Sequence, residues 1–167
     1  MNTILIKKQS VGQVVILDLL LLGAAMLIPA TSHLFAFPLY RLNPMLLILL
    51  AGMLVVQDRR NAFLLAVLLP MVSCLVTGMP SPMKAFCMGT ELCTVVGLFT
   101  LLSKKATNRL TTFIVLMGAI VAGKVVFYLL KMLIIAPEVL IGTNLMLQIC
   151  VALPLAALFA YFQTQRD

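Results

Sequence analysis

The feature that most constrains this chain is its division into long apolar runs separated by short polar segments. Six such runs lie at 11–30, 44–57, 62–78, 85–102, 110–135 and 144–162. A helix needs roughly 20 apolar residues to cross the hydrocarbon of a bilayer, and it satisfies its own backbone polar groups there. We therefore predict an all-α membrane protein, a bundle of six transmembrane helices forming one domain over residues 1–167.

The composition leaves little room for anything else. Of the 167 residues 63% are hydrophobic and 10% are charged, whereas soluble domains are about 25% charged. The four cysteines all lie within apolar runs, where small buried hydrophobic side chains are expected. His33 is the single histidine, predicted to lie in a loop, and no nucleotide-binding loop, zinc motif or nucleophile elbow is present. We expect neither an enzyme nor a bound metal or cofactor.

The basic residues indicate how the bundle is oriented. Six spans place both termini on one side, and that side carries eight of the 12 lysines and arginines, namely Lys7, Lys8, Arg59, Arg60, Lys104, Lys105, Arg109 and Arg166. The opposite side carries three and the interior of a span carries one. Cytoplasmic loops are enriched in Lys and Arg, so we predict a multi-pass protein of the inner (plasma) membrane with both termini in the cytoplasm. The net charge of +7 then reflects orientation rather than nucleic-acid binding.

A Gly/Pro-rich break interrupts the apolar sequence on the external side. The residues at 78–91 read GMPSPMKAFCMGTE, with a loop expected at 79–84. Irregular backbone at membrane depth is tolerated only where protein buries it or where it lines a cavity. We predict that Met79 and Pro80 cap a small-molecule site and that Glu91, on the helix that follows, forms its polar wall.

Three charged residues, Asp18, Glu91 and Lys124, lie well inside predicted spans. A charge at the bilayer centre costs on the order of 3 kcal/mol, so such residues pair or serve function. Glu91 and Lys124 are expected to pair, either as part of a ligand site or as an ion pair that only locks the fourth and fifth helices together. Asp18 lies nearer the cytoplasm and is expected to pair with a basic residue there.

Further polar residues fall on the fifth and sixth spans. Tyr128 and Lys131 share a helical face with Lys124, and this stripe either lines a pocket or anchors the helix at the membrane surface. Asn144 opens the sixth span, where it either caps the helix or joins the site, and Gln148 one turn further needs a partner in lipid. We predict that Lys124, Tyr128, Asn144 and Gln148 contact a substrate together with Glu91, Met79 and Pro80.

Small residues recur at four-residue spacing in the same two spans. Ala152, Ala156 and Ala160 do so in the sixth, and Gly118 with Ala122 and Ala119 with Gly123 do so in the fifth. Such faces let helices approach closely, so they are expected to pack within the bundle.

Four segments together resemble a known family. They are LNPMLLILLAG at 42–52, LPMVSCLVTGMPSPM at 69–83, MGTELCTVVGL at 88–98 and AGKVVFY at 122–128. In order and spacing they are similar to the substrate-binding (S) component of energy-coupling-factor (ECF) vitamin transporters. In that family a proline opens the second helix, Gly-Met-Pro follows the third, and a glutamate lies in the fourth.

The resemblance implies a substrate-capture subunit of an ECF-type ABC importer. A vitamin-sized solute would bind at the external side, and a separate transmembrane coupling subunit and two cytoplasmic ATPases would drive its delivery inward. The alternative is a structural membrane protein, such as a cell-shape or assembly scaffold, in which Glu91 and Lys124 serve folding alone. A membrane enzyme acting on lipid would need clustered His, Asp or Ser on its loops, which this chain lacks.

Overall fold

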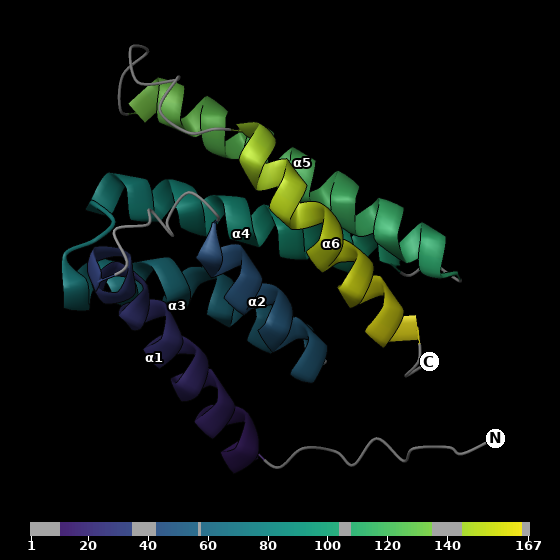
Figure 1. The fold of residues 1–167 in the computed structure, drawn as a ribbon, viewed down its shortest axis with the longest axis horizontal. Helices are drawn as coiled ribbons and strands as arrows, with labels where there is room; N and C mark the ends of the chain where they lie inside the picture. The colour runs from purple at the N-terminus through teal and green to yellow at the C-terminus, as the bar shows by residue number, and fades with distance from the viewer. Residues whose placement is uncertain (1–10, 35–42, 57, 104–107, 135–144, 165–167) are drawn as a thin grey trace.

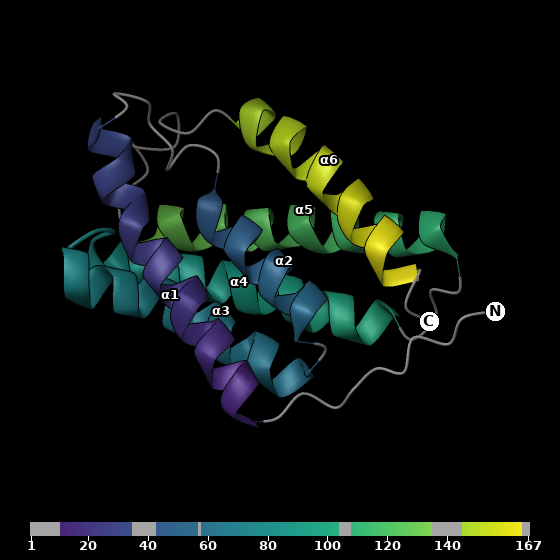
Figure 2. The ribbon, with the colours of Figure 1, turned by 60° about the horizontal axis from the view of Figure 1, so that its bottom comes forward.

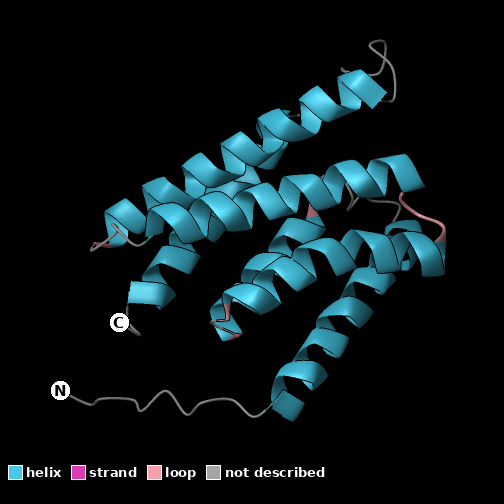
Figure 3. Cartoon of the chain, turned by 180° about the vertical axis from the view of Figure 1, so that it is seen from behind, coloured by secondary structure: helices cyan, strands magenta, loops and turns pink. Residues whose placement is uncertain are grey.

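The computed structural model describes residues 11–34, 43–56, 58–103, 108–134 and 145–164. Within these ranges the chain is all-helical, without a strand (Figure 3). The helices are α1 (Val11–Leu34), α2 (Pro44–Val55), α3 (Arg59–Thr77), α4 (Pro82–Leu102), α5 (Arg109–Ile134) and α6 (Leu145–Thr164). The predicted fold class is thus confirmed at the level of an all-α protein.

Several helices have the length and apolarity of membrane spans. Four of them qualify within the described residues: α1 over Val11–Pro29, and α3, α4 and α5 over their whole lengths. Helix α2 has 12 residues, which at 1.5 Å per residue is about 18 Å, well short of the roughly 30 Å of hydrocarbon. The apolar part of α6 is Gln148–Gln163. A membrane protein is therefore supported, while a count of six spans stays a prediction.

The helices form two layers of three. Helices α3, α4 and α5 lie side by side in one layer, with α4 in the middle, and α1, α2 and α6 lie across them in the other (Figures 1 and 2). Helix α2 contacts both α1 and α6. Successive helices run in opposite directions, so the starts of α1, α3 and α5 lie at the same end as the ends of α2, α4 and α6 (Figure 2).

Three helix boundaries differ most from the sequence-based expectation. Helix α1 continues to Leu34, so His33 lies in its last turn rather than in a loop. Helix α3 begins at Arg59 because the Asp58 side chain caps it, accepting a hydrogen bond from the Arg60 amide at 3.0 Å. Helix α4 begins with Pro82 in its first turn, a position where proline's missing N–H is not needed. The break between α3 and α4 is therefore shorter than 79–84.

Small residues set how closely the helices pack. Ala152, Ala156 and Ala160 are all buried and turn one face of α6 into the bundle. On α5, a Cβ atom added at Gly123 would lie 2.7 Å from Val95 Cγ2 and 3.0 Å from the Glu91 carbonyl oxygen, so only glycine permits this approach to α4. Gly118 faces open space instead, which assigns the close contact to the Ala119/Gly123 face.

Ring contacts join α6 to α4 and α5 near the C-terminal end of α6. Phe99 of α4 meets Phe159 of α6 edge-on, with ring centroids 5.3 Å apart. The Arg109 guanidinium lies 5.0 Å from the centroid of the Tyr161 ring, joining the start of α5 to the end of α6. Pro154 lies inside α6 between this anchored half and the half that begins at Leu145.

One expectation about the apolar runs stays open and another needs correction. Asp18 accepts a hydrogen bond from the Asn61 side chain, Nδ2 to Oδ1, at 3.0 Å; Lys7 and Lys8 lie outside the described residues, so a basic partner for Asp18 stays a prediction. Of the four cysteines only Cys87 is buried, and Cys150 is exposed on the surface of α6. The surface of a membrane protein faces lipid, which accepts such an apolar side chain without burial.

Candidate functional site

A buried ion pair joins the middle of α4 to the middle of α5. Lys124 Nζ lies 2.7 Å from Glu91 Oε1, and the two side chains are 11% and 3% exposed. The Lys124 ammonium also lies 5.5 Å from the centroid of the buried Phe127 ring, one turn along α5. The absence of a side chain at Gly123 lets the two helices approach at this level. The predicted pairing of Glu91 with Lys124 is confirmed.

Asn43 gives Glu91 a second partner from a third helix. Its Nδ2 donates a hydrogen bond to Glu91 Oε1 at 3.0 Å, and the residue is 6% exposed. Asn43 precedes Pro44 at the start of α2 and has a left-handed backbone, with φ at 52°, a conformation that asparagine tolerates better than most residues. Because one oxygen of Glu91 accepts from both Lys124 and Asn43, the carboxylate joins α2, α4 and α5.

A cavity opens beside this cluster, between α2, α5 and α6. Its volume is about 120 Å³, whereas one water needs roughly 10–15 Å³ on a comparable measure, so it has room for a small organic group. It is lined by Asn43, Leu46, Leu47, Met117, Ile120, Val121, Lys124, Val125, Tyr128, Gln148, Ile149, Val151 and Ala152.

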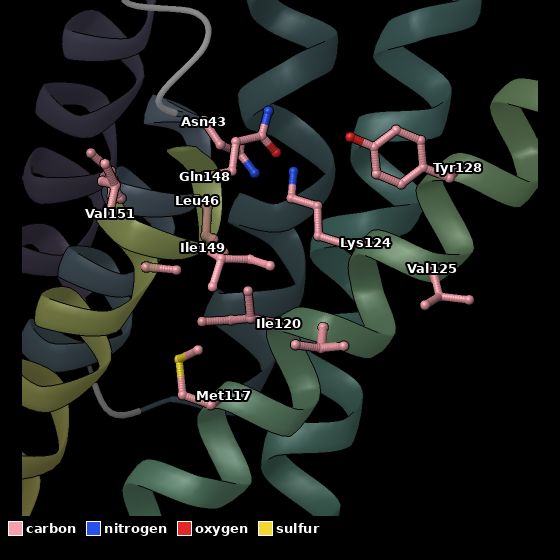
Figure 4. Close-up of a pocket in the computed structure, with 13 residues that line it drawn as sticks. Asn43, Leu46, Met117, Ile120, Lys124, Val125, Tyr128, Gln148, Ile149 and Val151 are labelled. Carbon is pink, nitrogen blue, oxygen red and sulfur yellow. The ribbon is translucent and has the colours of Figure 1, made fainter. Parts of the chain in front are cut away.

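The polar groups of this lining gather at one end. In Figure 4 the tips of Asn43, Lys124 and Gln148 lie close together, and the Tyr128 hydroxyl points toward them. Met117, Ile120 and Ile149 lie at the other end. A cavity of mostly apolar lining with a few convergent polar groups is typical of small-molecule sites.

Gln148 contributes a polar atom that the protein leaves unmatched. The residue is 9% exposed, and its Oε1 is buried without a hydrogen-bond partner. Buried polar atoms are almost always hydrogen-bonded, so an exception calls for an explanation such as a missing ligand or water. Gln148 lines the cavity, which makes this oxygen the candidate hydrogen-bond acceptor for a molecule bound there.

The structure brings together part of the predicted site. Lys124, Tyr128 and Gln148 line the cavity, and Glu91 lies directly behind Lys124 rather than in the lining. Asn144 falls outside the described residues. Lys131, the last member of the predicted stripe, is buried on α5 but does not line the cavity. Helix α2, which the sequence did not assign to the site, supplies a wall.

Met79 and Pro80 lie in the turn between α3 and α4. The Met79 carbonyl accepts hydrogen bonds of 2.9 Å from the side chains of Ser73 and Thr77, which tie the turn back onto α3. The Met79 side chain is 55% exposed, and neither residue lines the cavity. Their part in a substrate site stays a prediction.

Sequence reasoning missed Asn43 and the apolar wall of α2. The available signal was an asparagine directly before a proline that opens a helix. Its partner, 48 residues further along the chain, is a tertiary contact that a hydropathy pattern does not encode.

Comparisons of the chain with protein-family models, with curated proteins and with solved structures found no match. The chemistry of the site therefore rests on its own residues. These offer an ammonium group, amide groups, a phenol and an apolar enclosure, which together suit reversible binding of a small molecule.

Proposed function

We propose that this chain is the substrate-capture subunit of an ECF-type importer, spanning the inner (plasma) membrane six times with both termini in the cytoplasm. It would bind a small vitamin-like solute from the external side and act with a transmembrane coupling subunit and two ATPases. The observation that carries the proposal is the cavity between α2, α5 and α6, with the unmatched Gln148 oxygen at its polar end.

The position of the cavity along the bundle supports capture from outside. Gln148 lies in the first turn of α6 and Asn43 directly precedes α2. These helix starts lie at the end of the bundle opposite the starts of α1 and α5 (Figure 2), and the concentration of basic residues favours a cytoplasmic position for the latter end. At the other end, Arg109 of α5 contacts the Tyr161 ring of α6.

The direct test is purification from native membranes in mild detergent, followed by mass spectrometry of both small molecules and proteins. The capture role predicts one co-purifying metabolite together with coupling and ATPase subunits. A Gln148→Leu variant should accumulate normally and lose the metabolite, because the substitution keeps an apolar side chain of similar size and removes an acceptor oxygen that the protein leaves unmatched. Full-length protein that carries neither metabolite nor transporter subunits would count against the proposal.

A structural scaffold is the second candidate, favoured by one observation. Glu91 is already satisfied by Lys124 and Asn43 and thereby joins three helices. If Glu91 and Lys124 serve folding alone, the neutral double variant Glu91→Gln with Lys124→Met keeps the abundance and the function of the protein. In the capture role the discriminating variant is Gln148→Leu, which accumulates in the membrane but no longer supports uptake, whereas a scaffold is indifferent to it.

The orientation has its own test. A reporter that is active only in the cytoplasm, fused after Asp167, is expected to be active. A reporter inserted within 136–143 is expected to be inactive, because that segment follows α5 on the external side of the proposed topology. Activity of the second reporter would contradict the topology without bearing on ligand binding.

A further inference from the structure

The polar end of the cavity is electrically balanced before any ligand binds. Lys124 is the only charged side chain among the described residues that line it, and its ammonium nitrogen lies 2.7 Å from Glu91 Oε1. Glu91 lies behind Lys124, out of the lining. The one cationic side chain at the cavity therefore has its charge compensated from within the protein.

This balance disfavours charged ligands of both signs. An anion would have to share Lys124 with Glu91 and leave two carboxylate charges against one ammonium in a buried place, where electrostatic interactions are strong. A cation would meet Lys124 without an acidic side chain in the described lining to receive it. An uncharged ligand keeps the ion pair intact.

Gln148 specifies the hydrogen-bonding character of that ligand. Its amide carries an acceptor oxygen, which is buried and unmatched, and an NH₂ donor group. A hydroxyl or a primary amide on the ligand donates to the oxygen and also accepts hydrogen bonds. An ester or a tertiary amide offers an acceptor alone and leaves the Gln148 oxygen unmatched.

The remaining lining specifies the body of the ligand. Leu46, Ile120, Val121 and Ile149 are among the aliphatic side chains that enclose it, and the volume is about 120 Å³. Pockets for drug-sized ligands are about 300–1,000 Å³. The part of the ligand that enters this cavity is thus compact and apolar, of the size of a single ring.

We propose that the site selects an uncharged molecule with a hydroxyl or primary-amide head on a compact apolar body. The head donates a hydrogen bond to Gln148 Oε1, and Lys124 stays paired with Glu91. This inference rests on the proposed capture function, since it names the substrate class of the same cavity.

Four probes that share one ring and differ in the head test the proposal. They are benzamide, which is neutral with N–H donors, methyl benzoate, which is neutral without a donor, benzoate, which is an anion, and benzylammonium, which is a cation. Isothermal titration of the full-length protein in detergent at pH 7 measures their affinities. Benzamide is expected to bind at least about tenfold more tightly than each of the other three, a factor that corresponds to one hydrogen bond.

Two glutamines of α6 provide a matched pair of variants. Gln148→Leu should lower benzamide affinity to that of methyl benzoate. Gln163→Leu should leave all four affinities unchanged, because Gln163 also has a buried unmatched Oε1 but does not line the cavity. Neither substitution removes a recorded hydrogen bond of that oxygen, so both variants are expected to fold.

Each contrary result has a distinct meaning. Tighter binding of benzoate than of benzamide overturns the proposal and assigns Lys124 to an anionic ligand. Equal benzamide affinity in wild type and Gln148→Leu overturns it as well, as does the absence of benzamide binding. Failure of the capture function is recognised separately, by wild-type protein that purifies without a metabolite or transporter subunits while benzamide still binds.

Discussion

Two carboxylates inside this bundle have the same kind of partner and very different surroundings. Asp18 of α1 and Glu91 of α4 each accept a hydrogen bond of 3.0 Å from an asparagine on another helix, Asn61 and Asn43 respectively. Glu91 is 3% exposed and is also paired with Lys124 at 2.7 Å. Asp18 is partly exposed, and its hydrogen bond is partly buried.

The difference shows what a second partner adds. At Asp18 the amide–carboxylate contact links α1 to the start of α3, close to the end of the bundle predicted to face the cytoplasm. At Glu91 the same contact is combined with a cation, so a full charge is held deep in the bundle and the Lys124 ammonium is fixed at the wall of a cavity. One arrangement joins helices, and the other also shapes a site.

Removing the cation is expected to have the largest effect. Lys124→Met leaves Glu91 buried without a compensating charge, which should lower the free energy of unfolding by about 3–5 kcal/mol. Adding Glu91→Gln should restore most of this loss, because the neutral pair has no uncompensated charge. Equilibrium unfolding in mixed micelles measures the stability of the single and the double variant. If Lys124→Met alone is as stable as wild type, Glu91 is not held as an ion.

The two amides come next. Asn43→Gly removes the hydrogen bond to Glu91 but accepts the φ of 52°, so it isolates the amide, with an expected loss of about 1.5–3 kcal/mol. Asn61→Ala should lose less than about 1 kcal/mol, because its contact with Asp18 is partly open. The same unfolding measurement compares them, and equal losses would remove the distinction between the two carboxylates.

Helix spacing behind Glu91 is tested by two glycines of α5. Gly123→Ala places a Cβ atom 2.7 Å from Val95 Cγ2 and 3.0 Å from the Glu91 carbonyl oxygen, and the shift this forces should cost about 1–3 kcal/mol. Gly118→Ala meets open space and should be neutral or stabilising by up to about 1 kcal/mol. Unfolding midpoints of the two variants that move in the same direction would contradict this assignment of faces.

Neutralising the more open carboxylate is expected to matter least. Asp18→Asn keeps the shape of the side chain and an oxygen that accepts from Asn61, so stability should change by no more than about 0.5 kcal/mol. Abundance in the membrane and the unfolding midpoint are the measurements. A loss comparable to that of Lys124→Met would place Asp18 in an unrecognised charge network.

Hydropathy predicted where each helix runs but not where three of them begin or end. The start of α3 is set by Asp58, which caps the first turn, and α4 begins with Pro82, whose fixed φ and missing N–H suit a first turn. Helix α1 extends past the apolar run to Leu34, and the Thr31 hydroxyl lies within hydrogen-bonding distance of the carbonyls of Leu27 and Ile28 one turn back. Polar side chains that satisfy helix ends carry no hydrophobic signal.

The contacts of the candidate site could be predicted where the burial of a charged side chain required a partner. An unpaired charge inside an apolar bundle costs free energy, so the pairing of Glu91 with Lys124 could be predicted. Asn43 was missed because asparagine is common directly before a helix, so its presence there did not indicate a contact with Glu91. The walls of the cavity were only partly foreseen, since aliphatic residues of α2 and α5 are alike in sequence whether they face lipid, core or cavity.

The glycine contact between α4 and α5 has a mechanical consequence for the cavity. With the Glu91 carbonyl close to the bare α-carbon of Gly123, α5 has no space in which to move toward α4, and the wall that carries Lys124 is stiff. Helix α6 is fixed beyond Pro154 by Phe159 and Tyr161, but the proline interrupts its backbone hydrogen bonds just past the cavity. We therefore expect a guest larger than the resting volume to be accommodated by bending of α6, the compliant wall.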